Sequence, residues 1–167
     1  YSDRFAINSV QLRSLGIPTP HILDLYRFED GSTAVHYSPL PGSTLRQILQ
    51  GITAPAVRQA LVERFGKFMA QLHQQGVYFR SLHLGNVLVL EDGEFGLIDL
   101  ADLRIYPSSL SPSLRRRNLR HMQRYASDRH WLFEDHFEAL LARFAFVLVK
   151  RHRGSVWASR GPRRTRP

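Results

Sequence analysis

The stretch that decides the fold of this chain is residues 78–102, with the sequence YFRSLHLGNVLVLEDGEFGLIDLAD. Two short apolar runs flank Asp92-Gly93, a pattern typical of a β-hairpin with a tight turn. Asn86 ends the loop before the first strand and Asp99 follows the second, so the hairpin places an amide oxygen beside a carboxylate. Such oxygen donors suit Mg²⁺, which binds few protein ligands and shares its coordination with phosphates. The stretch therefore predicts a magnesium site for a phosphate-bearing ligand.

The composition indicates one globular domain. With 167 residues and 43% apolar residues, the chain is long enough and apolar enough for one hydrophobic core. It contains no cysteine, which excludes disulfides and thiolate metal sites within it and fits a reducing compartment. No signal-peptide pattern opens the sequence, and the longest apolar run, 144–149, is too short for a transmembrane helix. We expect a cytoplasmic protein.

The positive charge is distributed unevenly. Residues 1–100 contain 8 basic and 9 acidic side chains, whereas residues 101–167 contain 15 and 5, so the second segment carries all of the net charge of +9. This predicts an anionic partner for the C-terminal third: nucleic acid, acidic lipid head groups or a phosphorylated substrate. The alternative is a solvated basic surface followed by a disordered tail.

Apolar periodicity and turn residues predict an α+β arrangement. Hairpins are expected over 22–37, turning at 29–31, and over 87–98; helices are expected over 2–15, 44–49, 53–75, 112–127 and 131–152. The helix over 53–75 has the clearest pattern, with Thr53 as its expected cap, Pro55 in its first turn and Gly76 after its end. Its apolar stripe consists of Val57, Leu61, Phe65, Phe68 and Leu72.

Residues 79–86, Phe-Arg-Ser-Leu-His-Leu-Gly-Asn, resemble the catalytic loop of the protein-kinase-like fold, in the variant His-x-Asp-Leu-His-x-x-Asn. Leu82, His83 and Asn86 match that variant by position. Asp99 matches the metal-binding Asp that protein kinases write as Asp-Phe-Gly. The string from the loop to Asp102 is similar to the bacterial lipopolysaccharide-core kinase and toluene-tolerance family, and the resemblance covers residues 5–150.

This resemblance implies a protein-kinase-like fold made mostly of the helical C-lobe, with a partial N-lobe. Residues 1–42 would form the partial N-lobe and hinge, with Tyr37 on the hinge strand as a nucleotide contact. Residues 43–152 would form the C-lobe, and residues 153–167 a basic disordered tail. The helix over 2–15 would pack beside the nucleotide, and the helix over 53–75 would support the catalytic loop.

The resemblance also implies an ATP-dependent phosphotransferase with Mg²⁺ and ATP as cofactors and a sugar hydroxyl as acceptor. Asn86 and Asp99 would bind the metal and its phosphates. Ser81 and Asp102 would face the acceptor. Arg80 would stabilise negative charge. Structural alternatives stand beside these roles, because Asn can close a turn and Asp can accept backbone N–H groups in a bend. For His83 we favour a structural role that organises the loop.

The sequence departs from the family pattern at several positions. Ser81 stands where the family has its Asp base, and Phe79 stands where it has His. Nothing in the 167 residues corresponds to the Gly-rich strand or to the strand with the phosphate-binding lysine, since the only lysines are Lys67 and Lys150. The alternative function is therefore a pseudokinase that docks to an anionic membrane, a glycolipid or a protein without transferring phosphate.

The expected helix after Pro112 carries Arg116, Arg120 and Arg124 at i, i+4 spacing. Like charges at this spacing repel one another and persist with an anionic partner or in full solvation. The functional interpretation is a docking surface for the phosphorylated lipopolysaccharide core or for the anionic inner-membrane surface, which would make the protein peripheral there. Nucleic acid is disfavoured, because the chain has no recognisable nucleic-acid module.

Overall fold

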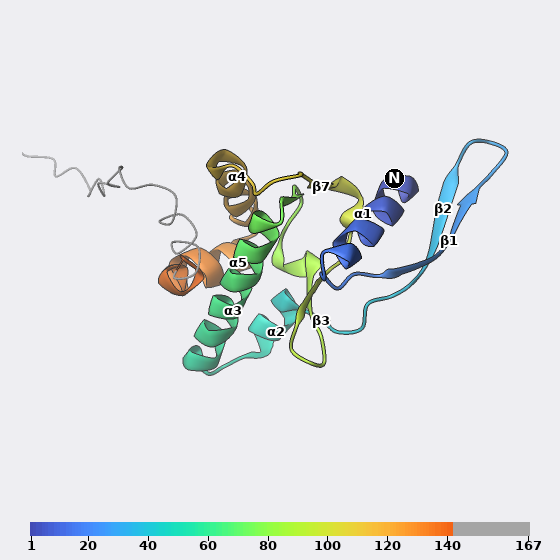
Figure 1. Cartoon of the computed structure of the whole chain (residues 1–167). Coiled ribbons are helices and arrows are strands. Elements are labelled where there is room, and N and C mark those ends of the chain that lie inside the picture. The colour runs from blue at the N-terminus through green and yellow to red at the C-terminus, as the bar shows by residue number, and fades with distance from the viewer. Residues whose placement is uncertain (142–167) are drawn as a thin grey trace, which may run out of the picture.

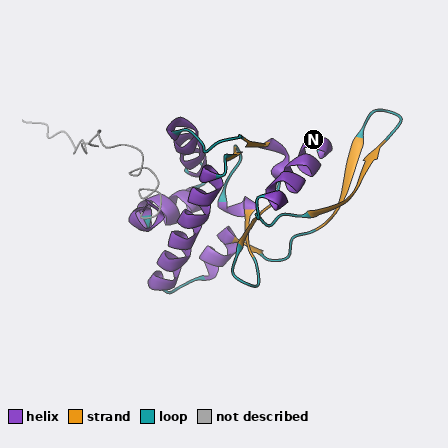
Figure 2. Ribbon diagram, in the orientation of Figure 1, coloured by secondary structure: helices purple, strands orange, loops and turns teal. Residues whose placement is uncertain are grey.

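The computed structural model describes residues 1–141, and within this range it combines helices and strands as the sequence predicts (Figure 2). The longest described helix, α3 (Pro55–Gln74), lies among the other helices (Figure 1). Strands β1 (His21–Arg27) and β2 (Thr33–Ser38) form a hairpin that projects beyond α1 (Ser2–Ser14), as Figure 1 shows. The tail predicted over 153–167 lies outside the described residues.

Helix α3 forms much of the hydrophobic core through one face. Leu61, Phe65, Phe68 and Leu72 are buried on it, as their spacing predicts. Pro55 occupies the first turn and Gly76 follows the end with φ +78°, both as expected. The expectation was wrong at the start of the helix: Ala54 is the N-cap, without a side-chain hydrogen bond, and Val57 is 55% exposed. In this first turn the helix has not yet reached the core, so its apolar stripe begins one turn later.

Both predicted hairpins are present. Strands β1 and β2 pair antiparallel around Gly31, and β5 (Val87–Val89) pairs with β6 (Phe95–Leu97) around Gly93, which has φ +83°. A short strand β3 (Ser43–Thr44) adds to the free edge of β5. It leads into α2 (Leu45–Gly51), where Thr44 and Gln47 form a capping box.

A third strand pair, which sequence analysis missed, connects the two ends of the decisive stretch. Strand β4 (Val77–Phe79) pairs antiparallel with β7 (Leu103–Ile105), and Phe79 is opposite Leu103. Each strand has only three residues, too few to show an alternating pattern. The pair nevertheless places the residues after Phe79 beside those before Leu103.

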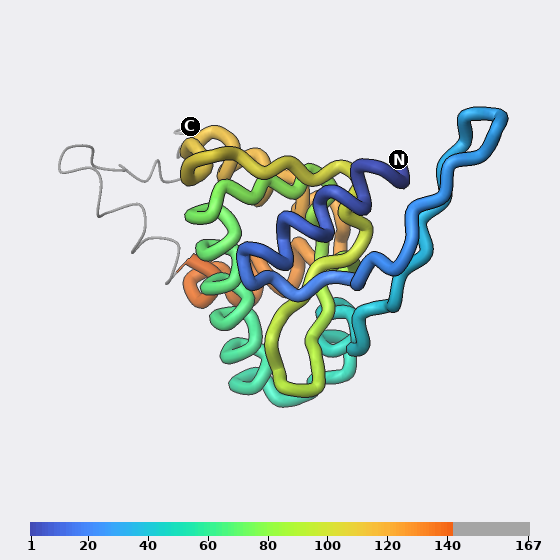
Figure 3. The backbone as a smooth tube through the Cα atoms, turned by 45° about the vertical axis from the view of Figure 1, so that its right-hand side comes forward, coloured from blue at the N-terminus to red at the C-terminus, as the bar shows by residue number. Residues whose placement is uncertain are grey.

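Helix α1 lies across the turn of 3₁₀-helix η2 (Leu100–Asp102), as Figure 3 shows. The buried side chain of Asn8 donates one hydrogen bond to Leu100 O at 2.7 Å and another to Leu103 O at 3.0 Å. One amide group thereby fixes the helix to the segment that follows Asp99.

The helix predicted over 112–127 is interrupted. Helix α4 (Pro112–Met122) has Ser111 as its N-cap and ends at Met122, and α5 (Ala126–Arg129) follows as a separate turn. The next segment, predicted as helix over 131–152, is π-helical over His130–Asp135, and residues 137–141 are helical; the rest lies outside the described residues. The break has a structural consequence, because it directs Asp128 into the protein interior.

We expect Gly76→Ala to lower the melting temperature by several degrees. A left-handed backbone costs an alanine about 1–2 kcal/mol, and a methyl group at Gly76 would lie 2.2 Å from Tyr106 O. Thermal unfolding followed by circular dichroism measures the effect. Gly51→Ala is the matched control, since no atom lies within 4 Å of the added methyl group. Equal melting temperatures for the two variants would contradict this account of the turn.

Candidate active site

The two predicted metal ligands lie at the same end of the β5–β6 hairpin, where Ile98 N donates a hydrogen bond to Asn86 O at 3.1 Å. The Asn86 side chain is 7% exposed, and its Nδ2 donates to Ser81 O at 3.4 Å. This bond leaves Oδ1 of Asn86 without a hydrogen-bond partner among residues 1–141. Asp99 follows with a left-handed backbone (φ 56°) and an exposed side chain.

These groups fit a magnesium ion by their chemistry. A partnerless amide oxygen and an exposed carboxylate are hard oxygen donors from two adjoining segments. No cluster of three or more His, Cys, Asp or Glu side chains that could hold a metal occurs among residues 1–141. A site with two protein ligands suits an ion that takes its remaining ligands from phosphates and water.

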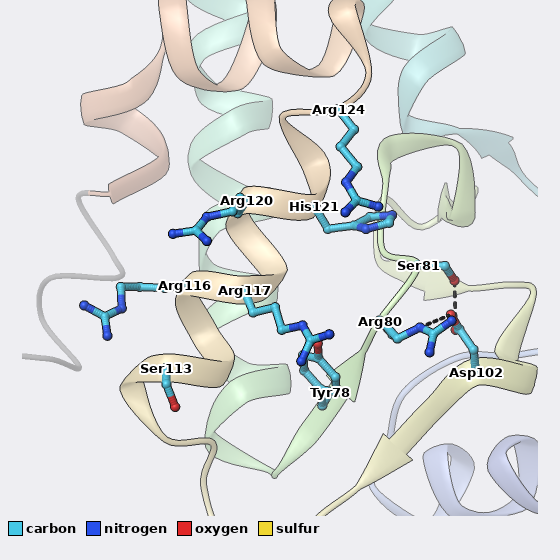
Figure 4. Close-up of a pocket in the computed structure, with 10 residues that line it drawn as sticks. All are labelled: Tyr78, Arg80, Ser81, Asp102, Ser113, Arg116, Arg117, Arg120, His121 and Arg124. Carbon is cyan, nitrogen blue, oxygen red and sulfur yellow. Dashed lines mark hydrogen bonds and ion pairs between the residues drawn. The ribbon is translucent and has the colours of Figure 1, made fainter.

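The second group of predicted residues also comes together. Ser81 Oγ donates a hydrogen bond to Asp102 Oδ1 at 2.8 Å, and Arg80 Nε lies 3.9 Å from Asp102 Oδ2 (Figure 4). The β4–β7 pairing causes this proximity, because Ser81 follows β4 and Asp102 precedes β7. Ser81 and Asp102, expected to face the acceptor, and Arg80, expected to stabilise negative charge, therefore form one hydrogen-bonded and ion-paired group.

Two tyrosines lie near the metal-ligand candidates. The Tyr1 hydroxyl donates a hydrogen bond to Asp99, and this bond together with burial raises the pKa of Tyr1 to about 12. Tyr37, predicted as a nucleotide contact, is exposed on β2, and its ring lies 5.2 Å from that of Phe5 on α1. Tyr37 is thus close to the start of α1, the part of the chain where Tyr1 contacts Asp99.

A buried ion pair between Asp128 and Arg46 supports the loop that contains Leu84, and sequence analysis missed it. Asp128 is fully buried; it accepts hydrogen bonds from Arg46 Nε at 2.9 Å and Nη2 at 3.0 Å, and from Leu84 N at 2.9 Å. Its carboxylate raises the pKa of Arg46. The three residues lie far apart in the sequence, so no local motif could have identified them.

His83 has the structural role expected for it. Its Nδ1 accepts a hydrogen bond from Gly85 N at 3.0 Å, and its ring lies 4.6 Å from that of Tyr125. Burial and the nearby Arg46 lower the pKa of His83, so the imidazole is neutral at pH 7. A neutral ring that accepts from the loop backbone shapes the turn before Asn86.

A second buried pair anchors the strand that leads into the loop. Asn118 on α4 donates to Phe79 O at 2.6 Å, and its Oδ1 lies 3.2 Å from Nε2 of His73 on α3. Burial lowers the pKa of His73 to about 4. The neutral histidine connects α3, α4 and β4, in agreement with the supporting role expected for the helix over 53–75.

An arginine-rich cleft of about 980 Å³ opens beside the Ser81–Asp102 pair. One wall is the loop, and the other is α4 (Figure 4). The residues that line it are Tyr78, Arg80, Ser81, Asp102, Ser113, Arg116, Arg117, Arg120, His121 and Arg124. Asp102 is the only carboxylate among them, so the cleft carries a strong positive charge.

The basic side chains of α4 and of Arg124, which follows the helix, divide into two sets. Figure 4 shows Arg117, His121 and Arg124 directed toward the loop, and Arg116 and Arg120 directed away from Ser81. The sequence-based prediction chose Arg116, Arg120 and Arg124 by their spacing and gave no role to the adjacent Arg117 or to His121. Within residues 1–141, neither the three α4 arginines that line the cleft nor Arg124 makes an ion pair.

The loop, the hairpin with Asn86 and Asp99 at one end, and the Ser81–Asp102 pair are the features of a kinase-like protein. A family model confirms this class: the chain belongs to the lipopolysaccharide kinase (Kdo/WaaP) family, whose model matches residues 42–144. Membership indicates a kinase-like phosphotransferase and implies the use of ATP and a divalent metal. No curated protein matches the chain. Within residues 1–141, no helix has the length and apolar character needed to span a membrane.

Asp128→Asn should reduce the free energy of unfolding by about 3 kcal/mol, because removing one partner of a buried ion pair leaves the other charge uncompensated. Urea denaturation followed by tryptophan fluorescence measures this loss. The control is Glu134→Gln, which removes an exposed ion pair with Arg129 and should cost less than about 1 kcal/mol. If both variants lose the same small amount, Asp128 does not hold the loop.

Proposed function

We propose that this protein transfers the γ-phosphoryl group of ATP to a hydroxyl group of a lipopolysaccharide-core sugar. The single observation that carries the proposal is the position of Asn86 and Asp99. Their oxygens lie at one end of a hairpin, next to a cleft that contains a hydrogen-bonded Ser81–Asp102 pair. Family membership supports the reaction type.

Asn86 and Asp99 would hold Mg²⁺, which when bound neutralises phosphate charge and orients the phosphates. The hydrogen bond from Asn86 Nδ2 to Ser81 O orients the amide so that Oδ1 is available as a ligand. Residues 1–42 would act as the partial N-lobe and hinge, with Tyr37 against the nucleotide, and the C-lobe would begin at residue 43.

Asp102 is the proposed general base. Its carboxylate lies in the cleft, held by the hydroxyl of Ser81 and by Arg80, and it can accept the proton of an acceptor hydroxyl. A positioned base contributes a factor of about 10²–10⁴ in rate. Phosphoryl transfer depends mainly on positioning and electrostatics, so a base supplied from the neighbouring segment preserves most of the catalysis.

Arg117 and Arg124, here called the inner arginines, would bind the acceptor. Arg117 and Arg124 are directed toward the loop, and Arg80 completes the positive wall on the other side. Guanidinium groups bind phosphate and carboxylate groups through paired hydrogen bonds. An acceptor with acidic substituents, such as a phosphorylated lipopolysaccharide core, would be held with its free hydroxyl near Asp102.

Arg116 and Arg120, here called the outer arginines, support a second function. Arg116 and Arg120 are exposed, make no ion pair within residues 1–141 and are directed away from Ser81. Together with serine at the usual base position, this favours a pseudokinase that docks on an anionic inner-membrane surface from the cytoplasmic side. The two functions depend on different arginines, so they can be separated by experiment.

Magnesium–ATP should raise the melting temperature of the full-length protein, and Asp99→Asn should abolish that increase because it removes the charged ligand. Differential scanning fluorimetry with and without Mg²⁺ measures the shift. Asp92→Asn is the matched control, since this carboxylate lies in the turn at the opposite end of the same hairpin. Stabilisation that persists in Asp99→Asn would remove the basis for the metal site.

Charge reversal of the inner and outer arginines should have different effects. Arg117→Glu with Arg124→Glu should weaken binding of phosphorylated core oligosaccharide at least tenfold, because it replaces attraction with repulsion beside the acceptor. Arg116→Glu with Arg120→Glu should leave that binding within a factor of two or three. Isothermal titration calorimetry measures both.

The outer pair tests the docking function. If the protein docks on membranes, Arg116→Glu with Arg120→Glu should abolish sedimentation with phosphatidylglycerol vesicles at low salt, since each basic residue near such a surface contributes about 1 kcal/mol. A wild-type protein that does not sediment with these vesicles would exclude membrane docking. Equal loss of oligosaccharide binding in both double variants would argue against a specific acceptor cleft.

A further inference from the structure

Ser81 has the surroundings of a nucleophile. Its hydroxyl donates a hydrogen bond to a carboxylate, Asp102 Oδ1, at 2.8 Å, and the other oxygen of that carboxylate lies 3.9 Å from Arg80 Nε. A hydroxyl, a base within hydrogen-bond reach and a third group that orients the base are the arrangement found at activated nucleophiles. The side chain is only partly buried and lines the open cleft, so a reactant can approach it.

Ser81 also lies next to the proposed phosphate site. Its carbonyl oxygen accepts the hydrogen bond from Asn86 Nδ2, so the candidate metal ligand and the hydroxyl are held by the same turn. Ser113 lines the same cleft and provides a contrast. Its hydroxyl is 2.9 Å from that of Ser111, and no carboxylate contacts it within residues 1–141.

The cleft can stabilise a phosphate on Ser81. Phosphoserine carries about 1.5 to 2 negative charges at pH 7, and Arg117 and Arg124 are directed toward the loop that would bear it. The positive potential also appears at His121, whose pKa is lowered by burial and by the nearby Arg124. These guanidinium groups would offset the repulsion between the new phosphate and Asp102.

We propose that Ser81 is a phosphoryl acceptor and that the protein phosphorylates itself there, an inference that rests on the ATP-binding function proposed above. Ser81 Oγ attacks the γ-phosphorus of ATP while its proton passes to Asp102. The bond between the γ-phosphorus and the bridging oxygen of the β-phosphate breaks, and ADP leaves. The product is a phosphoserine at the position where the family has its catalytic Asp.

The test is incubation of the full-length protein with Mg²⁺ and ATP, followed by intact-mass measurement and peptide mapping. We expect one phosphoryl group on Ser81 in the wild type and in Ser113→Ala, and none at this position in Ser81→Ala. Asp102→Asn should slow the modification by about 10²–10⁴, the usual contribution of a positioned base. Ser81→Thr keeps a hydroxyl and should yield phosphothreonine.

Modification that is confined to other residues, or that proceeds at the wild-type rate in Asp102→Asn, would overturn the proposal. Binding of Mg²⁺–ATP, followed by thermal shift, separates this failure from failure of the proposed function. If ATP binds but Ser81 is not phosphorylated, only the self-phosphorylation is rejected, and the ATP-binding function stands.

Acetyl phosphate, a small donor that needs no nucleotide site, completes the test. Ser81 marked by acetyl phosphate in a protein that does not bind ATP supports the serine nucleophile and rejects the ATP-dependent function. If neither ATP nor acetyl phosphate phosphorylates Ser81 and the protein does not bind ATP, both the serine nucleophile and the ATP-dependent function are rejected. Circular dichroism of Ser81→Ala and Ser81→Thr checks that each variant is folded.

Discussion

The pairing of β4 with β7 is the constraint on which the candidate site depends. These two strands are only three residues long, yet they bring the loop after Phe79 beside the segment before Leu103. The contact between Ser81 and Asp102 follows directly from this register. Short strands of this kind are stable only when they are fixed from outside. Asn118 fixes the end of β4 and Asn8 fixes the start of β7, each through hydrogen bonds to backbone carbonyl oxygens.

The acidic and basic side chains of the site lie in separate regions. The buried carboxylate of Asp128 is neutralised by Arg46 and serves the loop backbone, whereas Asp99 and Asp102 lie at the surface. Apart from Arg80, which pairs with Asp102, the arginines that line the cleft have no acidic partners among residues 1–141. Such a field attracts anions and increases their local concentration. A donor and an acceptor that both carry acidic groups would therefore meet where the neutralising charge is already in place.

The departure from the family pattern at Ser81 acquires a physical meaning in the structure. The serine does not leave an empty position, because its hydroxyl donates to Asp102, which the following segment supplies. By the resemblance, Ser81 stands at the family's base position, and in the structure a hydroxyl and a carboxylate are in hydrogen-bond contact there. Both proposals, the carboxylate as base for an external hydroxyl and the serine as phosphoryl acceptor, use this same pair of residues.

Sequence patterns determined the local elements and the residue types of the loop. Turn residues such as Gly31 and Gly93 and the apolar stripe of α3 specify their elements through contacts between near neighbours. The loop motif was sufficient to place Asn86 and Asp99 at one end of a hairpin, because the tight turn at Asp92-Gly93 brings the two ends of the intervening segment together. The family assignment followed from the same short stretch and is confirmed over residues 42–144.

Only the tertiary structure decided which distant side chains serve the site. Asp128 reaches the loop because the predicted helix breaks after Met122, and Arg46 meets it across 82 residues of sequence. The face of α4 that lines the cleft depends on how that helix packs on β4, so Arg117 and His121 were missed although Arg124 was found. Periodicity along a helix identifies its faces, but the packing of its neighbours determines which face meets the ligand.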